Sequence, residues 1–226
     1  MTADGALAIA PDGAAITLAG LEKSFPAAGG ARRVLTGADL TVRPGEIVAL
    51  AGRSGSGKTT VLSIVAGWED PDAGTVEVLG GATAPAQLSW SELAVLPQSL
   101  GMLDELTLAE NVGLPLRLAQ VPRAADPHEV MDRLGVGHLG DRYPREVSLG
   151  EQQRAALARA TVVRPQVLLA DEPTMHQNRG WAETVMATLA DLAARGTACV
   201  VATHDAVALA AADRVVEMHE GRLRPR

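Results

Sequence analysis

The stretch GRSGSGKT at residues 52–59 has the residue types and spacing of a phosphate-binding loop. It fits the pattern G-x-x-x-x-G-K-[ST], in which glycines let backbone N–H groups surround phosphate oxygens without side-chain clashes. A helix that starts at the end of the loop adds its N-terminal dipole. Lys58 can place its charge between the β- and γ-phosphates, the Thr59 hydroxyl can bind Mg²⁺, and Thr60 can reach the α-phosphate. We expect the nucleotide to be bound by Gly52, Ser54, Gly55, Ser56, Gly57, Lys58, Thr59 and Thr60.

Two acidic residues end a second apolar run, VLLADEPT at residues 167–174. Successive side chains of a strand point to opposite faces, so Asp171 and Glu172 should face different surroundings. Asp171 can hold Mg²⁺ through water opposite Thr59, and Glu172 can polarise an attacking water molecule. A positioned metal and an oriented water are what phosphoryl transfer to water requires.

Three further residues stand where they could contact a bound nucleotide. His204, in VATHD, ends a predicted strand and could donate a hydrogen bond to the γ-phosphate, since ligands of such sheets bind beyond the strand ends. Gln98 lies where the α/β pattern gives way to a helical one. Phe25, the only phenylalanine, precedes the glycine-rich loop and could stack on adenine, or it could simply fill the core.

Composition excludes several classes of protein. The 226 residues carry a net charge of −7, which argues against a nucleic-acid partner, because such partners require a broad basic face. Apolar residues make up 47% and aromatic residues 2%, so the core must be aliphatic. The single cysteine, Cys199, lies in an apolar run and is expected to be an inert buried thiol. No uncharged apolar window of 18 residues predicts a membrane span, and the N-terminus lacks the basic region of a secretory signal.

Apolar patterning predicts an α/β fold with a parallel sheet covered on both faces, because its strands are apolar without alternation. We expect strands over 15–20, 32–42, 46–50, 75–80, 167–173 and 198–205, helices over 58–67, 180–195 and 206–213, and a closing hairpin over 215–224. From about residue 88 to 160 the spacing is helical, which predicts an insertion of roughly 60 residues. Its expected helices cover 105–120, 128–137 and 151–163.

Together these motifs resemble the ATP-binding subunits of ABC transporters, and the resemblance extends from Ile16 to Leu223. GRSGSGKTT resembles the Walker A motif of that family, and VLLADEPT its Walker B motif with Glu172 as the catalytic glutamate. Gln98 resembles the Q-loop glutamine that binds Mg²⁺ or the attacking water, His204 the switch histidine, and Phe25 the adenine-stacking aromatic residue. VSLGEQQR, residues 147–154, is similar to the signature motif, in which Ser148 and Gly150 would contact ATP.

The resemblance implies a P-loop ABC-ATPase fold with a mostly parallel core sheet, an N-terminal antiparallel β-subdomain and a helical insertion. It implies one domain, with residues 1–14 as a flexible leader, 15–90 and 161–226 as the ATP-binding core, and 91–160 as the helical subdomain. Within the family, the run LDELTLAENVGLPLRLA is similar to the macrolide-export and lipoprotein-release branch. Such subunits form head-to-tail dimers, bind ATP and Mg²⁺, and power an integral membrane permease-type subunit at the cytoplasmic face of the cell membrane.

Two stretches depart from the family pattern. Leu149 stands where the signature has its first glycine. Two interpretations stay open: its side chain holds the backbone away from the partner's ATP and excludes a positive φ, or it points aside and only slows turnover. The segment Met175–Asn178, MHQN, replaces a loop that ends in Leu-Asp and crosses the dimer interface. Both departures lie on surfaces that serve the partner, whereas the chain's own ATP-binding residues are intact.

The leading hypothesis is an ATP-hydrolysing subunit that drives an export or mechanotransmission system, with residues 99–115 as the coupling surface. It would act in a homodimer, or in a heterodimer with another ABC ATPase that supplies the better signature. The alternative is a nucleotide-dependent clamp with little hydrolysis, which Leu149 and Asn178 favour and Glu172 opposes. A small-molecule kinase would need a substrate lid and a phosphate-acceptor site, and the signature-like helix argues against it.

Overall fold

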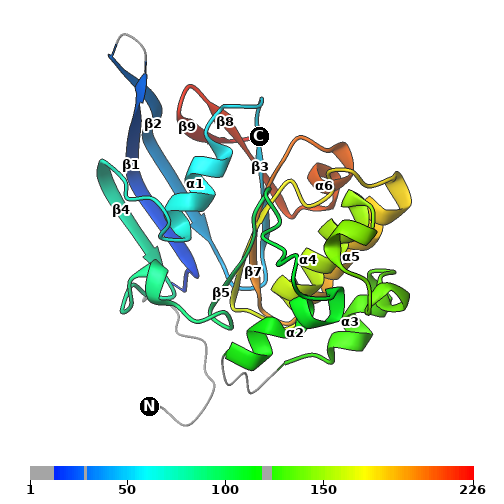
Figure 1. Cartoon of the computed structure of the whole chain (residues 1–226). Coiled ribbons are helices and arrows are strands. Elements are labelled where there is room, and N and C mark those ends of the chain that lie inside the picture. The colour runs from blue at the N-terminus through cyan, green and yellow to red at the C-terminus, as the bar shows by residue number, and fades with distance from the viewer. Residues whose placement is uncertain (1–12, 28–29, 119–123) are drawn as a thin grey trace.

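A computed structural model of the chain describes residues 13–27, 30–118 and 124–226. Most of the expected leader therefore lies outside the described residues. Two sheets organise the described chain (Figure 1). The smaller sheet is antiparallel, with strand order β2-β1-β4, and the larger has the order β5-β6-β7-β3-β8-β9. The first five strands of the larger sheet pair in parallel, and β9 pairs antiparallel to β8.

The strands are β1 (Ile16–Ala27), β2 (Gly30–Val42), β3 (Ile47–Ala51), β4 (Ala73–Val78), β5 (Leu93–Leu96), β6 (Val167–Asp171), β7 (Ala198–Thr203), β8 (Arg214–His219) and β9 (Arg222–Pro225). The α-helices are α1 (Lys58–Val65), α2 (Leu108–Leu118), α3 (Pro127–Arg133), α4 (Leu149–Thr161), α5 (Arg179–Ala193) and α6 (Ala206–Ala211). Short 3-10 turns lie at Pro85–Gln87, Gly137–Leu139 and Pro144–Glu146. The expected α/β class, mostly parallel core sheet, antiparallel N-terminal sheet and helical insertion are all confirmed.

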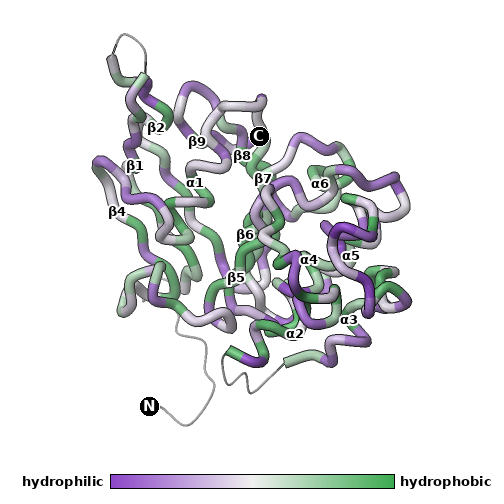
Figure 2. The backbone as a smooth tube through the Cα atoms, in the orientation of Figure 1, coloured by the Kyte–Doolittle hydropathy of each residue, from purple (hydrophilic) through white to green (hydrophobic). Residues whose placement is uncertain are grey.

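The parallel sheet is buried on both faces, as its unalternating apolar strands predict. Every residue of β3, β6 and β7 is buried, and Figure 2 shows apolar colouring along the centre of the fold. Residues of β6 alternate between two clusters: Leu169 packs with α1 and the antiparallel sheet, whereas Leu168 packs with α4 and α5. Helix α1 thus lies between the two sheets, and the helical insertion covers the other face (Figure 1).

Residues 93–96 differ from the sequence prediction. We expected the helical part to begin at about residue 91, but β5 pairs in parallel with β6 and forms the edge of the core sheet. The run LAVL is only four residues long and apolar throughout. A short apolar run of this kind has no period that separates a strand from a buried helix segment.

Side-chain caps fix several helix starts next to the site. Ser148 caps α4 and Asn178 caps α5, each by accepting a hydrogen bond from a backbone N–H of the first turn. Helix α1 differs, because its N-cap is Gly57, no side chain caps it, and its first turn holds no acidic residue. The first N–H groups of α1 are therefore left facing the loop that precedes it.

Candidate active site

The glycine-rich loop joins the buried strand β3 to α1. At Gly57, φ is +113°, and a Cβ atom there would lie 3.0 Å from Val34 Cγ1, so only glycine fits without strain. The Lys58 ammonium folds back over the loop, where it donates hydrogen bonds to Gly52 O at 2.9 Å and Arg53 O at 3.4 Å. Lys58 is buried, so its charge is directed into the loop rather than into bulk solvent. The loop, the charge and the uncapped helix form a concave surface that presents the donors an anion requires.

Asp171 ends β6 beside the start of α1. Thr59 Oγ1 donates a 2.7 Å hydrogen bond to Asp171 Oδ2, so the two residues predicted to share Mg²⁺ are in direct contact. Burial raises the pKa of the Asp171 carboxyl, and the nearby Glu172 carboxylate adds to that rise. The hydrogen bond from Thr59 and the charge of Lys58 oppose it. A bound cation would favour the ionised carboxylate at this position.

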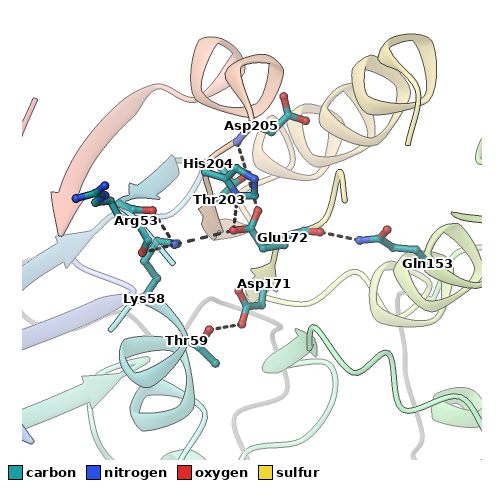
Figure 3. A network of polar contacts seen from close by, with 10 residues as sticks. Arg53, Lys58, Thr59, Gln153, Asp171, Glu172, Thr203, His204 and Asp205 are labelled. Atoms are coloured by element: carbon teal, nitrogen blue, oxygen red, sulfur yellow. Dashed lines mark hydrogen bonds and ion pairs between the residues drawn. The ribbon is translucent and has the colours of Figure 1, made fainter. Parts of the chain in front are cut away.

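Glu172 points the other way, toward Lys58 and the end of β7 (Figure 3). Its Oε2 accepts a hydrogen bond from Thr203 Oγ1 at 3.1 Å, and its Oε1 lies 2.9 Å from His204 Nδ1 and 4.0 Å from Lys58 Nζ. The backbone of Glu172 has φ +49°, which is uncommon for a residue with a side chain. Such strain is concentrated at functional sites, where surrounding contacts hold it in place.

One pocket of about 450 Å³ brings the predicted residues together. Phe25 and Gln98 also line it, at a distance along the chain from the loop. The predicted residues lining this pocket are Phe25, Gly52, Ser54, Gly55, Ser56, Gly57, Lys58, Thr59, Thr60, Gln98, Asp171, Glu172 and His204. The nucleotide-binding, metal-binding and catalytic roles of these residues stay predictions.

Sequence reasoning missed several residues that this pocket uses. Arg32 and Val34 of β2 line the pocket, and Arg32 donates a 3.2 Å hydrogen bond to Gly55 O. Thr203 holds Glu172, and Gln153 of α4 donates a 2.6 Å hydrogen bond to Glu172 O. Only Thr203 could have been found from the sequence, because it stands next to His204 at the end of a predicted strand. The others act through contacts between segments that lie far apart in sequence.

Ser148 and Gly150 do not line this pocket. They lie at the start of α4, where Ser148 Oγ accepts from Glu151 N at 3.3 Å while Glu151 Oε2 accepts from Ser148 N at 2.7 Å. The Ser148 hydroxyl also donates a 2.7 Å hydrogen bond to Glu151 Oε2, and this bond, followed by the one from Ser148 N, lowers the pKa of Glu151. Both residues thus belong to a helix start that is capped by its own side chains and is separate from this pocket.

Leu149 is the first residue of α4, and its side chain is 47% exposed. It is not among the described residues with positive φ, so the backbone conflict expected for a side chain at this position does not arise. The side chain instead projects from the helix start. In the other divergent stretch, His176 is exposed with φ +61°, and Asn178 Oδ1 accepts from Trp181 N at 3.0 Å as the cap of α5.

The pocket fits a nucleotide with Mg²⁺ on the chemistry of its own residues. Ser56 Oγ is buried without a hydrogen-bond partner, and the first turn of α1 is uncapped, so donors are available for phosphate oxygens. The described residues contain no cluster of three or more acidic, histidine or cysteine side chains that could enclose a metal. Mg²⁺ does not require one, because it commonly binds one or two carboxylates together with substrate phosphates and water.

Comparisons with known proteins agree with this geometry. Residues 35–175 match the ABC transporter family. The chain is 39% identical to the lipoprotein-releasing system ATP-binding protein LolD 1 of Rhodospirillum rubrum, over 93% of this chain and 97% of that protein. It is 36% identical to the macrolide export ATP-binding/permease protein MacB of Salmonella typhi, over 93% of this chain and 34% of that protein.

Solved structures give the same result. A dimeric post-hydrolysis state of the ATP-binding cassette MJ0796, bound to ADP and Pi, superimposes with a TM-score of 0.82 at 26% identity, covering 93% of this chain and 97% of that one. The chain therefore belongs to the ABC transporter family, as an ATPase of that family. Its place among the lipoprotein-release and macrolide-export relatives was expected from the sequence and is confirmed. Among the described residues, no helix combines the length and apolar character that a membrane span needs.

Proposed function

We propose that this chain binds ATP with Mg²⁺ and hydrolyses it to power a separate integral membrane protein of the lipoprotein-release or macrolide-export type. The observation that carries the proposal is the convergence of Lys58, Glu172 and His204 within one pocket, with the Thr59–Asp171 pair beside them. The names of two relatives, a lipoprotein-releasing ATP-binding protein and a macrolide export protein, support the class of system.

In this proposal the loop 52–59 holds the phosphates and Phe25 stacks on the adenine. Thr59, Asp171 and Gln98 hold Mg²⁺, which when bound neutralises developing charge on the phosphates. Lys58 is confined by its hydrogen bonds to the loop carbonyls, so its charge is already oriented before phosphate binds. Preorganised charges of this kind stabilise a transition state at little reorganisation cost.

Glu172 is the residue that we propose orients and polarises the attacking water. Its two oxygens accept one hydrogen bond each from Thr203 and His204, which leaves further lone pairs free to accept from water. Thr203 is buried, so it fixes the direction of the carboxylate. His204 is exposed and is suited to exchange its contact with Glu172 for one with the γ-phosphate.

Ser148 and Gly150 act on the nucleotide of a partner subunit in this proposal. Their position on the surface, outside the chain's own pocket, supports a head-to-tail dimer in which each ATP lies between one loop and the other chain's α4. The related cassette MJ0796 is described as dimeric. The partner is a second copy of this chain or another ABC ATPase.

The membrane partner docks, we propose, where the coupling surface expected over 99–115 begins. Two adjoining hollows of about 340 and 380 Å³ lie there, and Gln98 and Ser99 line the second. Trp68, Val95 and Pro97 line both, and Trp68 is 61% exposed, which is unusual for so large an apolar side chain. The second hollow also contains Gln98, Thr59 and Asp171, so a protein seated there would contact the nucleotide pocket directly. Docking would hold the chain at the cytoplasmic face of the cell membrane.

A second candidate function is a nucleotide-dependent clamp with little turnover. Its supporting observation is Leu149, whose exposed isobutyl group projects from the surface that would approach the partner's ATP. A related possibility is a heterodimer in which the partner supplies the better signature. In both cases the chain's own pocket binds ATP normally.

Sedimentation of the Glu172→Gln variant, with and without MgATP, tests these proposals. Loss of the carboxylate should trap ATP between two subunits, so an ATP-dependent dimer is the result expected for a homodimeric motor. A monomer that still binds ATP would indicate that α4 of this chain needs a different partner. A chain that binds no nucleotide would overturn the proposed function altogether.

A further inference from the structure

The two stretches that depart from the family pattern are in contact. A Cβ atom added at Gly150 would lie 2.9 Å from His176 O, so the loop after β6 packs directly on the first turn of α4. Gly150 follows Leu149, and His176 belongs to the divergent segment Met175–Asn178. The residues that looked like two separate departures in the sequence therefore form one structural unit.

Gln177 makes the polar connection within this unit. Its Nε2 donates a 2.9 Å hydrogen bond to Gly150 O and lies 3.5 Å from Gln153 Oε1. Its Oε1 accepts a 2.8 Å hydrogen bond from Arg154 Nη1. Both ends of the Gln177 amide are thus engaged by the first two turns of α4.

Buried neighbours fix the two α4 side chains that Gln177 meets, those of Gln153 and Arg154. Arg154 also donates to Leu134 O at 2.9 Å, and its guanidinium lies 4.2 Å from the centre of the Trp181 ring. Gln153 is 5% exposed and directs its Nε2 to Glu172 O. That carbonyl belongs to the residue whose backbone has φ +49°, and whose side chain faces the nucleotide pocket.

We propose that Gln177 and Gln153 are positioning residues that couple the nucleotide pocket of this chain to its own signature helix α4. The connection runs from Glu172 through its carbonyl to Gln153, and from Gln153 and Gly150 to Gln177. Nucleotide in the pocket then steadies the helix that serves the other site of the dimer. The inference rests on the proposed function, because it requires nucleotide to bind beside Glu172.

The network is mostly buried, so its hydrogen bonds have few water molecules to replace them. A buried amide that loses its partner pays a desolvation cost in addition to the lost hydrogen bond. Replacement of Gln177 by methionine keeps the length of the side chain and removes both hydrogen bonds. Replacement by glutamate keeps an acceptor for Arg154 but removes the donor to Gly150 O.

Hydrogen exchange on the isolated chain tests the coupling, at a dilution where sedimentation shows monomers, so that no partner's nucleotide can protect α4. In the wild-type chain, MgADP should slow exchange both in residues 52–65 and in the peptide covering 150–160. In Gln177→Met, exchange in 150–160 should be about three- to tenfold faster without nucleotide, and the response to MgADP should be reduced to what the bond from Gln153 to Glu172 O alone transmits. Residues 52–65 should still be protected, and Gln177→Glu should behave like Gln177→Met if the bond to Gly150 O carries the coupling.

Gln152→Met is the matched control, because Gln152 is the neighbouring glutamine of α4 and its side chain donates its hydrogen bond to Val147 O, at 3.3 Å, rather than to the network around Gln177. It should leave the nucleotide response of 150–160 intact. The inference is overturned if Gln177→Met retains that response in full, or if the wild-type helix never responds while 52–65 is protected. Absence of protection at 52–65 in the wild-type chain would instead contradict the proposed function.

Discussion

The carboxylates of the nucleotide pocket and the start of the signature helix are held in opposite ways. In the pocket, burial raises the pKa of Asp171, and Glu172 sits in the left-handed region of φ. At the start of α4, Ser148 and Glu151 cap each other reciprocally, and the hydrogen bonds from Ser148 lower the pKa of Glu151. The pocket thus holds a carboxyl group and a backbone conformation that are energetically unfavourable. The start of α4, by contrast, is stabilised by its own hydrogen bonds.

This difference supports the proposal that the pocket, and not the start of α4, is adapted to a ligand of the chain's own. A desolvated carboxylate and a strained backbone lower stability, and they persist where a bound cation or a reaction uses them. The capped helix start needs no ligand to complete its own hydrogen bonds. Substitutions in the pocket should therefore change mainly hydrolysis and nucleotide binding. Substitutions at the start of α4 should change mainly the association of subunits.

The largest effect is expected for hydrolysis in Glu172→Gln. The amide cannot accept a proton from water as the carboxylate does, so kcat should fall by about 100-fold or more. Nucleotide binding should persist, because Lys58 and the loop are unchanged. Steady-state phosphate release measures the rate, and Glu183→Gln, which changes an exposed glutamate that pairs with Arg179, is the control. A fall in kcat of less than tenfold would mean that the pocket does not use this carboxylate.

The next largest effect is expected for nucleotide affinity, and it distinguishes the pocket from the start of α4. Lys58→Met removes a charge directed into the loop, so the Kd of the isolated chain for MgADP should rise at least about 30-fold, as loss of charge-assisted hydrogen bonds predicts. Ser148→Ala changes only the start of α4 and should change that Kd far less than Lys58→Met does, through the coupling of α4 to the pocket alone. Titration calorimetry measures both. Equal weakening by the two substitutions would contradict the assignment of α4 to a partner's site.

A smaller effect is expected for Leu149→Gly, which removes the apolar group projecting from the helix start. If that group holds the closed interface apart, its removal should strengthen ATP-dependent dimerisation of the Glu172→Gln chain by about tenfold, since excess bulk at an interface costs about 1–3 kcal/mol. Leu118→Gly controls for glycine in a helix end, because Leu118 is the exposed last residue of α2. Unchanged dimerisation would show that Leu149 is tolerated.

Most residues that line the pocket could be predicted from the sequence, because they stand at the ends of recognisable elements. The loop 52–59 and the pair Asp171–Glu172 each follow a buried strand, and parallel strands bring their carboxyl ends to one edge of the sheet. Strand alternation also predicted that the two carboxylates point apart, as Figure 3 shows. These inferences depend on local pattern alone.

What could not be predicted depends on contacts between distant segments. Arg32, Thr203 and Gln153 reach the site through tertiary packing that no local period encodes. Strand β5 was missed because four apolar residues have no distinguishing period. The role of Gln177 was hidden for the same reason, since its partners lie on a helix more than 20 residues earlier.

The smallest predicted effects are on stability, and they should have opposite signs in the two regions. Because the folded state raises the pKa of Asp171, ionisation of that carboxyl costs stability once the pH rises above its ordinary range near 4. Asp171→Asn removes the cost and can still accept the Thr59 hydrogen bond. At pH 7 without nucleotide, it should therefore raise the free energy of unfolding by about 1 kcal/mol, or about 2–4 °C in Tm.

Ionisation of Glu151 has the opposite effect on stability, because the folded state lowers the pKa of this carboxyl. The ionised form stabilises the fold at a pH above the ordinary pKa of glutamate, and this stabilisation is lost in acid. Glu151→Gln should lower the free energy of unfolding at pH 7, by no more than about 0.5 kcal/mol because solvent screens this surface group. Urea titrations at pH 7 and at pH 4 measure both variants, and both differences should shrink at pH 4. If Asp171→Asn is less stable than the wild-type chain, Thr59 and Lys58 fully offset the cost of burying the ionised Asp171 carboxylate. The contrast between a strained pocket and a capped signature would then be wrong.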